Sequence, residues 1–138
     1  ILFLCVANSC RSQMAEGFAK HYAGEKAEIY SAGSQPTKVN PMAIKVMKEK
    51  RIDISYQCSK SLSDVPQDIS IVITLCSEAE ATCPFFPGKV ERLHFPFDDP
   101  AKAVGNEDEV LMAFRQIRDA IDEKIESFLK ERNLYAGR

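Results

Sequence analysis

Short apolar runs along this chain alternate with segments in which apolar residues recur every three or four positions. Continuous apolar or β-branched runs predict buried strands, whereas recurrence at three or four positions predicts amphipathic helices. Four runs are predicted to be strands, namely residues 1–5, 28–31 (with the chain turning at Gly33), 69–75 and 90–95. The run at 69–75 is the clearest of them, because β-branched residues make up most of it.

Two helices are predicted directly after strands. Residues 12–23 carry apolar side chains on one side, and Gly24 is a typical stop. Residues 77–82 are expected to form one or two helical turns, because Pro84 and Pro87 follow them and proline disfavours helix at the preceding position.

Two further helices are predicted from their capping residues. Asn40 followed by Pro41 is a strong start, and this helix is expected to reach about Lys50. Asn106 with Glu109 three positions later resembles a capping box and opens the last helix. An apolar stripe follows at helical spacing and is interpreted as core: Val110, Phe114, Ile117, Ile121, Ile125 and Phe128.

The alternation of strands and helices predicts a single doubly wound α/β domain built from all 138 residues. Its centre is a four-stranded parallel sheet with right-handed crossovers and flanking helices, and residues 133–138 are expected to fray. Ligands of such sheets bind beyond the carboxyl ends of the strands. Cys5, Cys76 and the Asp98-Asp99 pair all follow predicted strand ends, so we expect them at one rim.

Composition and charge exclude several classes of protein. The net charge is −2 and no basic stripe with interleaved aromatics is present, which argues against nucleic-acid binding. No apolar run reaches the ~18–20 residues of a membrane span and no signal peptide is visible, so a cytoplasmic protein is expected. The five cysteines are an odd number and include no C-x-x-C pair, which favours reactive or packed thiols over a disulfide framework or a zinc site.

The segment between the first strand and the first helix carries the most specific chemistry. A cysteine, five residues and an arginine in this position build a cradle of backbone N–H groups for a tetrahedral oxyanion. The loop residues expected to bind it are Val6, Ala7, Asn8, Ser9, Cys10, Arg11 and Ser12. Arg11 is expected to donate hydrogen bonds to two substrate oxygens. The positive field of the loop N–H groups and Arg11 should also lower the pKa of Cys5 well below the ~8.5 of a free thiol. Cys5 is therefore the candidate nucleophile.

The chain resembles the low-molecular-weight protein tyrosine phosphatase superfamily and, within it, the thioredoxin-coupled arsenate reductases. The motifs that carry the resemblance are Cys5-x5-Arg11-Ser12, Tyr30-Ser31-Ala32-Gly33, Asn40-Pro41, Thr74-Leu75-Cys76, Cys83-Pro84 and Phe97-Asp98-Asp99-Pro100-Ala101. Three features are similar to the reductases: the segment Gln13–Gly17 where phosphatases usually place a proline, Ala101 where they usually place tyrosines, and the pair Cys76 and Cys83.

The resemblance implies a relay of three thiols. Cys5 attacks arsenate, Asp99 protonates the departing hydroxide, and Cys76 then attacks Cys5 and releases arsenite. Cys83 next attacks Cys76, and thioredoxin reduces the resulting disulfide. Asp98 stays open as an alternative acid. Phosphate and sulfate are expected to mimic arsenate, because all three present similar tetrahedral oxygens.

The helix between the last two cysteines limits this relay. Seven residues of helix span roughly 10 Å, whereas a disulfide tolerates Cα atoms only up to about 7 Å apart. Residues 77–82 are therefore expected to unwind when Cys76 and Cys83 bond.

Two details of the loop follow from the same resemblance. Ala7 stands where the family usually has glycine, and a positive φ there would strain alanine by roughly 1 kcal/mol. Asn8 and Ser31 are expected to hydrogen-bond the loop. In some of these reductases the residues matching Asn8, Glu16 and Ser31 contribute to a potassium site, whereas no cofactor is expected to be obligatory.

Two other functions remain open. A phosphomonoesterase acting on phosphotyrosine would use Cys5, Arg11 and Asp99 and would have no use for Cys83. A redox sensor or oxyanion-binding module would bind arsenate or sulfate with the same thiols and release no arsenite. The reductase ranks first because reduction of As(V) needs two electrons, which a dithiol supplies when it becomes a disulfide.

Overall fold

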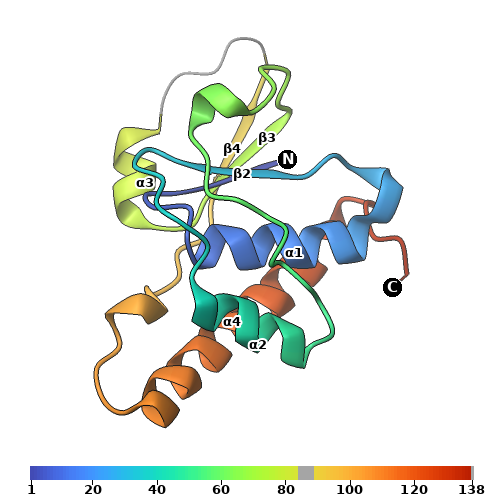
Figure 1. Cartoon of the computed structure of the whole chain (residues 1–138). Coiled ribbons are helices and arrows are strands. Elements are labelled where there is room, and N and C mark those ends of the chain that lie inside the picture. Colours follow the sequence, from blue (N-terminus) through green and yellow to red (C-terminus); the bar gives the residue numbers. More distant parts are fainter. Residues whose placement is uncertain (84–88, 138) are drawn as a thin grey trace.

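A computed structural model describes residues 1–83 and 89–137 of the chain. Its four strands are β1 (Leu2–Cys5), β2 (Tyr30–Gly33), β3 (Ile71–Thr74) and β4 (Glu91–His94). They form one sheet in the order β2-β1-β3-β4, and every neighbouring pair is parallel (Figure 1). The predicted α/β fold with a four-stranded parallel sheet is therefore confirmed.

The helices fall where the start and stop signals place them. They are α1 (Arg11–Ala23), α2 (Pro41–Glu49), α3 (Ser77–Thr82) and α4 (Glu107–Glu131), with 3-10 turns at η1 (Gly24–Lys26), η2 (Leu62–Asp64) and η3 (Pro100–Lys102). Both predicted caps are present: the Asn40 side chain accepts from the N–H of Met42, and Asn106 and Glu109 form a reciprocal capping box. The predicted stops Pro84 and Pro87 lie outside the described residues.

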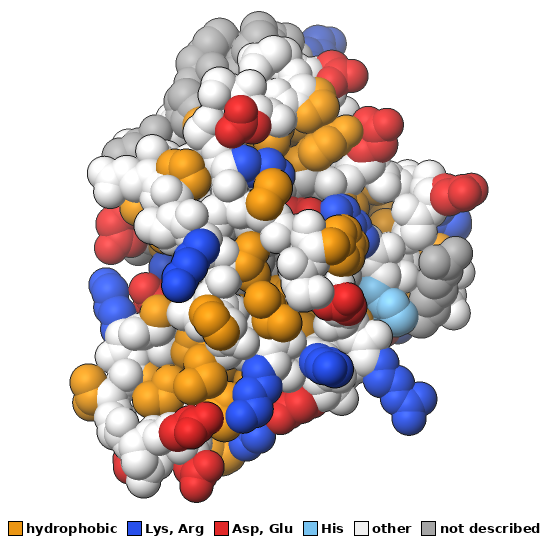
Figure 2. All heavy atoms as spheres, viewed as in Figure 1, with side chains coloured by type: hydrophobic (Ala, Val, Ile, Leu, Met, Phe, Trp, Pro, Cys, Tyr) orange, Lys and Arg blue, Asp and Glu red, His pale blue; other side chains and the backbone are white. Residues whose placement is uncertain are grey.

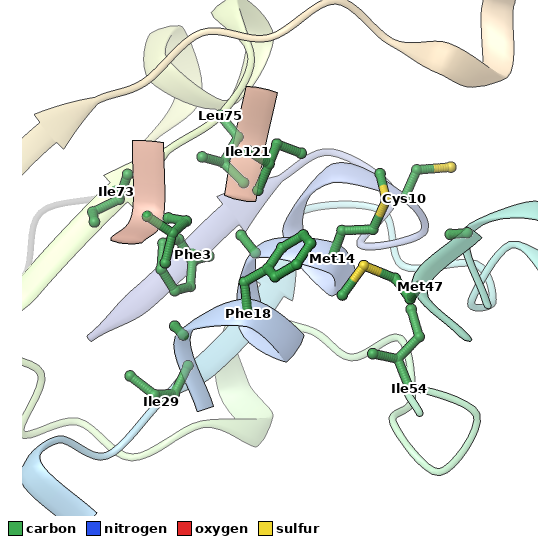
Figure 3. Packing of buried hydrophobic residues seen from close by; sticks show 14 of the residues in the cluster. Phe3, Cys10, Met14, Phe18, Ile29, Met47, Ile54, Ile73, Leu75 and Ile121 are labelled. Atoms are coloured by element: carbon green, nitrogen blue, oxygen red, sulfur yellow. The ribbon is translucent and has the colours of Figure 1, made fainter. Parts of the chain in front are cut away.

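The sheet separates two cores of unequal size. Helices α1, α2 and α4 lie on one side of the sheet and α3 with η2 on the other (Figure 1). The larger core packs Phe3 and Ile73 of the sheet against Met14 and Phe18 of α1 and Ile121 of α4 (Figure 3). The smaller core is formed by Leu2, Leu4, Cys5, Ala32, Val65, Ile69, Val72, Cys76 and Ala79. The second face is thus covered mainly by the six-residue helix α3 and the segment around η2.

The order of the strands creates a switch point between β1 and β3. From β1 the chain crosses to β2 on one side, and β3 and β4 follow on the other. Crevices at such a point are the usual ligand sites of open α/β sheets. Cys5 ends β1, and Cys76 lies two residues beyond β3.

The prediction that residues 133–138 fray is wrong for the described residues 133–137. Asn133 adopts a left-handed φ of 58°, and the N–H of Leu134 donates to Leu129 O at 2.8 Å, which is the Schellman end of a helix. The N–H of Ala136 then donates to Tyr22 O of α1 at 2.7 Å. Leu134 packs against the larger core, so this segment is docked rather than loose.

On the face seen in Figure 2, acidic and basic side chains are interspersed. Among the described residues, no helix is both long enough and apolar enough to cross a membrane.

Candidate active site

The loop between β1 and α1 ends at a helix terminus that favours anions. Helix α1 begins at Arg11, and the residue before it, Cys10, provides no side-chain cap. The first turn also holds no acidic residue. Unpaired N–H groups at such a terminus carry partial positive charge and point toward the loop. An oxyanion held in the loop would satisfy these N–H groups.

The loop lines a cavity of about 310 Å³. The lining residues are Cys5, Val6, Ala7, Ser9, Cys10, Arg11, Thr37, Glu78, Asp99, Ala101 and Lys102. Five of the predicted oxyanion-binding residues from 6 to 12 are thus at its wall. The other two, Asn8 and Ser12, are fully buried beneath the loop. Glu78 and Lys102 were not predicted, although both follow strand ends at the predicted rim.

Arg11 closes the loop onto the segment that follows β4. Its Nη1 donates to Phe97 O at 2.9 Å, and its Nη2 lies 3.6 Å from Asp99 Oδ2. The buried Nε–H has no hydrogen-bond partner within the part of the chain that is described. Because an unsatisfied buried donor is costly, an oxygen of a bound oxyanion is the natural acceptor for it.

Asn8 fixes the conformation of the loop through its own backbone angle and the hydrogen bonds of its buried side chain. It adopts a left-handed φ of 49°, which asparagine tolerates better than most residues. Its Nδ2 donates to Ser12 Oγ at 2.8 Å and to Ser31 Oγ at 3.0 Å, and its Oδ1 accepts from the N–H of Lys60 at 3.0 Å. The predicted hydrogen bonding by Asn8 and Ser31 is confirmed. Ala7 does not have a positive φ, so the strain considered for it does not arise.

Further hydrogen bonds support the loop, and several of them come from residues that are distant in sequence. Gln13 Nε2 donates to Asn8 O at 3.0 Å, Ser59 Oγ donates to the same oxygen, and Gln57 Nε2 donates to Gln13 Oε1 at 2.8 Å. Sequence reasoning missed Gln57 and Ser59 because they lie in a stretch without hydrophobic periodicity. On the other side of the loop, the N–H groups of Gln35, Thr37 and Asn40 donate to the carbonyls of Val6, Ala7 and Ser9.

Gly33 is required where β2 ends against the loop. A Cβ at this position would lie 2.4 Å from Val6 O and 2.9 Å from Asn8 N, which are backbone atoms without room to move. We expect Gly33→Ala to displace the loop and to lower oxyanion affinity at least about tenfold. Isothermal titration with phosphate measures this effect. The matched control is Gly137→Ala: its φ of 84° disfavours alanine locally, but nothing lies within 4 Å of a Cβ there, so phosphate affinity should stay parental. Unchanged phosphate affinity in Gly33→Ala would refute the steric argument.

Two of the three predicted relay cysteines lie side by side. The sulfurs of Cys5 and Cys76 are 3.7 Å apart, and both side chains are buried. A disulfide between them needs a movement of less than 2 Å, because an S–S bond is about 2.05 Å long. Cys83 is half-buried at the far end of α3, and its carbonyl accepts from Arg92 Nη2 at 3.3 Å. The intact helix α3 therefore separates Cys83 from Cys76.

The predicted lowering of the Cys5 pKa is wrong for this arrangement. The pKa of the Cys5 thiol is raised to about 12, mainly by burial. The Arg11 guanidinium acts in the opposite direction, and the neighbouring Cys76 contributes to the rise. Burial disfavours the charged thiolate by removing it from water. Sequence reasoning counted the positive loop and Arg11 but could not count the burial, which depends on how Cys76 and α3 pack over the sulfur.

The raised pKa makes a testable prediction about pH. Below its pKa, the thiolate fraction of Cys5 grows about tenfold per pH unit, so alkylation of Cys5 by iodoacetamide should keep rising from pH 7 to pH 10. Removing Cys76 removes a cause that raises the pKa, so Cys76→Ala should shift this profile to lower pH. Peptide mass spectrometry resolves Cys5 from exposed Cys58, the internal reference. A Cys5 profile that levels off near pH 7 would contradict the assignment.

The two candidate acids differ in position. Asp99 lines the loop cavity, and its Oδ1 accepts from the N–H of Ala101 at 3.0 Å as the cap of η3. Asp98 lines only the neighbouring open groove of about 640 Å³, which Cys76 and Ile117 also line. Position therefore favours Asp99 over Asp98 as the proton donor to a group bound in the loop.

The three residues considered for a potassium site, Asn8, Glu16 and Ser31, lie together, but their side chains already have hydrogen-bond or ion-pair partners. Ser31 Oγ donates to the buried Glu16 carboxylate, and Lys20 Nζ contacts its other oxygen at 2.6 Å. Lys60 Nζ lies 3.6 Å from Glu16 Oε1. With Asn8 Oδ1 already accepting from the Lys60 N–H, these residues do not fit a potassium ion, since two ammonium groups already balance the one carboxylate.

The remaining cysteines and histidines have packing or surface positions. Cys10 is buried in the larger core near Met14 and Met47 (Figure 3), and burial raises its pKa to about 11. Cys58, His21 and His94 are exposed. Within the described residues, no group of three or more His, Cys, Asp and Glu side chains could hold a metal ion.

A loop that starts at a buried cysteine and closes on an arginine, at the switch point of a parallel sheet, is typical of phosphatase-like cysteine enzymes of the α/β class. The model of the low molecular weight phosphotyrosine protein phosphatase family matches residues 1–135. The chain therefore belongs to this family.

Known proteins that are similar to this chain include arsenate reductases and a tyrosine phosphatase. Arsenate reductases of Halalkalibacterium halodurans and Bacillus subtilis are 49% and 48% identical to the chain over 129 residues, which cover 93% of this chain and of each relative. A solved arsenate reductase in its oxidized state has a TM-score of 0.80 at 32% identity, covering 94% of this chain and 95% of that one. A tyrosine phosphatase from Erwinia amylovora has a TM-score of 0.78 at 18% identity and shares the fold.

Proposed function

We propose that this protein reduces arsenate to arsenite through the thiols of Cys5, Cys76 and Cys83, with thioredoxin as the reductant. The observation that carries the proposal is the 3.7 Å distance between the sulfurs of Cys5 and Cys76 beside an anion-binding loop. A phosphatase needs one thiolate and a water, and a second buried sulfur at this distance serves redox chemistry instead. Relatives at 48–49% identity bear the name arsenate reductase, which supports the same conclusion.

The first step forms a covalent adduct. The Cys5 thiolate attacks arsenic while Arg11 and the loop N–H groups hold the oxygens. The arsenic–oxygen bond to one hydroxyl breaks, and Asp99 protonates the departing hydroxide to water. Because burial raises the pKa of Cys5, this step requires removal of the thiol proton as the oxyanion binds.

The second and third steps carry the electrons. The Cys76 thiolate attacks the Cys5 sulfur, and the sulfur–arsenic bond breaks with its electron pair staying on arsenic, which becomes As(III). Cys83 then attacks Cys76 in the new disulfide and releases Cys5 as a thiolate. Thioredoxin reduces the Cys76–Cys83 disulfide by exchange, so each arsenate consumes two electrons from one dithiol.

One assay separates this function from its alternatives. With thioredoxin, thioredoxin reductase and NADPH, the reductase releases one arsenite for each NADPH oxidised. A phosphomonoesterase would instead hydrolyse an aryl phosphate rapidly and oxidise no NADPH. A redox sensor or binding module would retain arsenate without releasing arsenite, and either of these results would overturn the proposal.

We also infer that the enzyme works in the cytoplasm and without potassium. All five cysteines are free, and a thiol relay depends on a reducing compartment. The ammonium groups of Lys20 and Lys60 neutralise the Glu16 carboxylate, whose negative charge would otherwise attract a cation.

Without a bound potassium ion, the protein should have the same thermal stability in potassium and in non-potassium salts. The midpoint of thermal unfolding in 0.1 M KCl should match that in 0.1 M choline chloride within about 1 °C, because a cation that binds only the native state would raise it. Differential scanning fluorimetry measures both midpoints. Stabilisation that is specific to potassium and saturates with its concentration would show that the ion competes successfully with the lysines.

A further inference from the structure

Helix α3 stands between the last two relay cysteines and is held to the domain by few apolar contacts. Among its side chains that the structure describes, only Ala79 is buried, whereas Ser77, Glu78, Glu80 and Ala81 are exposed. A helix of six residues is too short to be stable on its own. Its helical form therefore depends on how it is attached to the sheet.

One polar cluster attaches the second half of α3 to the ends of two strands. Thr74 Oγ1 donates to the Glu80 carboxylate and lies 2.9 Å from His94 Nδ1. His94 Nδ1 is also 3.7 Å from Glu80 Oε2. Thr74 and His94 are paired in register as the last residues of β3 and β4, and the Thr74 side chain is buried.

This cluster opposes the movement that the third thiol needs. Cys76 caps the start of α3 and Cys83 caps its end, so roughly 10 Å of helix separates them. Their disulfide requires Cα atoms within about 7 Å, which the intact helix prevents. As the helix unwinds, Glu80 leaves Thr74, and a buried hydroxyl loses its charged partner.

We propose that the contact of Thr74 with Glu80, supported by His94, holds α3 closed and sets the rate at which Cys83 reaches Cys76. The inference rests on the proposed relay. While α3 is closed, the Cys76 sulfur lies 3.7 Å from the Cys5 sulfur, and the helix keeps Cys83 away from both. Once Cys5 and Cys76 have formed their disulfide, release of α3 lets the Cys83 thiol attack Cys76, which breaks the Cys5–Cys76 bond and returns Cys5 as a thiolate. Thr74 and Glu80 are thus positioning residues that order the two disulfide steps.

The decisive variant is Thr74→Val, because it removes the hydroxyl from the strand, nearly keeps the volume and leaves the composition of α3 unchanged. We expect amide hydrogen exchange in residues 77–82 of the reduced protein to accelerate about tenfold. In a single turnover with arsenate, conversion of the Cys5–Cys76 disulfide into the Cys76–Cys83 disulfide should accelerate by a similar factor. Formation of the Cys5–Cys76 disulfide should keep its parental rate.

Three further variants and one control complete the test. Thr74→Ser restores the hydroxyl and should restore parental exchange, Glu80→Ala should match Thr74→Val, and the double variant should be no faster than either alone. Glu25→Ala, an exposed acid in η1, is the control for lost charge. Parental exchange in Thr74→Val would overturn the holding contact, and faster exchange with an unchanged second disulfide step would overturn its control of the relay. If the parent forms no Cys76–Cys83 disulfide at all, the proposed function fails, while the exchange result still decides whether Thr74 holds α3.

Discussion

Replacing Arg11 with lysine is expected to lower kcat/KM for arsenate by about 100- to 1,000-fold. The guanidinium donates to Phe97 O, approaches Asp99 and has a buried Nε–H that no described residue accepts, which leaves it available to an oxyanion. Lysine carries the same charge but has neither the planar fork nor the reach for three partners. Losing one donor that stabilises developing charge typically costs two to three orders of magnitude. Steady-state kinetics with thioredoxin in excess measures the loss.

Arg115→Lys is the matched control, because its salt bridge to Glu49 lies on exposed parts of α4 and α2. It should keep parental kinetics. In Arg11→Gln, which removes the charge, a Cys5 alkylation profile that moves to higher pH would further tie the loss to the loop, since the Arg11 charge lowers the pKa of Cys5. Parental kcat/KM in Arg11→Lys would show that the guanidinium fork is not needed to bind and activate arsenate.

Replacing Cys83 with serine is expected to abolish continuous turnover and preserve the first turnover. Cys5 and Cys76 are already 3.7 Å apart, so one arsenite per enzyme should still form and leave a Cys5–Cys76 disulfide. Both sulfurs are buried in the reduced protein, so we expect thioredoxin not to reach this disulfide, and steady-state arsenite release should fall at least about 1,000-fold. Rapid-quench measurement of arsenite gives the burst and the steady state together.

Cys58→Ser is the control for a lost thiol, since Cys58 is exposed and contributes only its backbone carbonyl to the supports of the loop. It should turn over like the parent. Weak hydrolysis of aryl phosphate should persist in Cys83→Ser, because the loop, Arg11 and Asp99 are unchanged. Sustained arsenite release by Cys83→Ser would mean that the reductant attacks Cys76 or Cys5 directly.

Local signals in the sequence were sufficient for the fold. The caps at Asn40 and Asn106, the β-branched run before Cys76 and the cysteine-to-arginine spacing each act over a few residues, and each occurs where it was predicted. A parallel sheet then gathers its strand ends at one edge, which is why the convergence of Cys5 and Cys76 could be foreseen.

Features that depend on contacts between distant segments could not be foreseen. The supports that Gln57 and Ser59 provide to the loop join residues more than 40 positions apart and leave no periodic pattern. The raised pKa of Cys5 follows from burial beneath distant elements rather than from its neighbours in sequence. Lys60 beside Glu16 is a third case, because a single sequence does not reveal which charge will face a buried carboxylate.

The relay itself is tested most directly by mapping disulfides after one equivalent of arsenate. Non-reducing peptide mass spectrometry on the acid-quenched parent should find the Cys76–Cys83 disulfide with Cys5 reduced, and in Cys83→Ser it should find the Cys5–Cys76 disulfide. Arsenite should appear in equal amount to the disulfide in both proteins. Arsenite formation with Cys76 still reduced in both proteins would contradict the transfer of oxidation from Cys5 through Cys76.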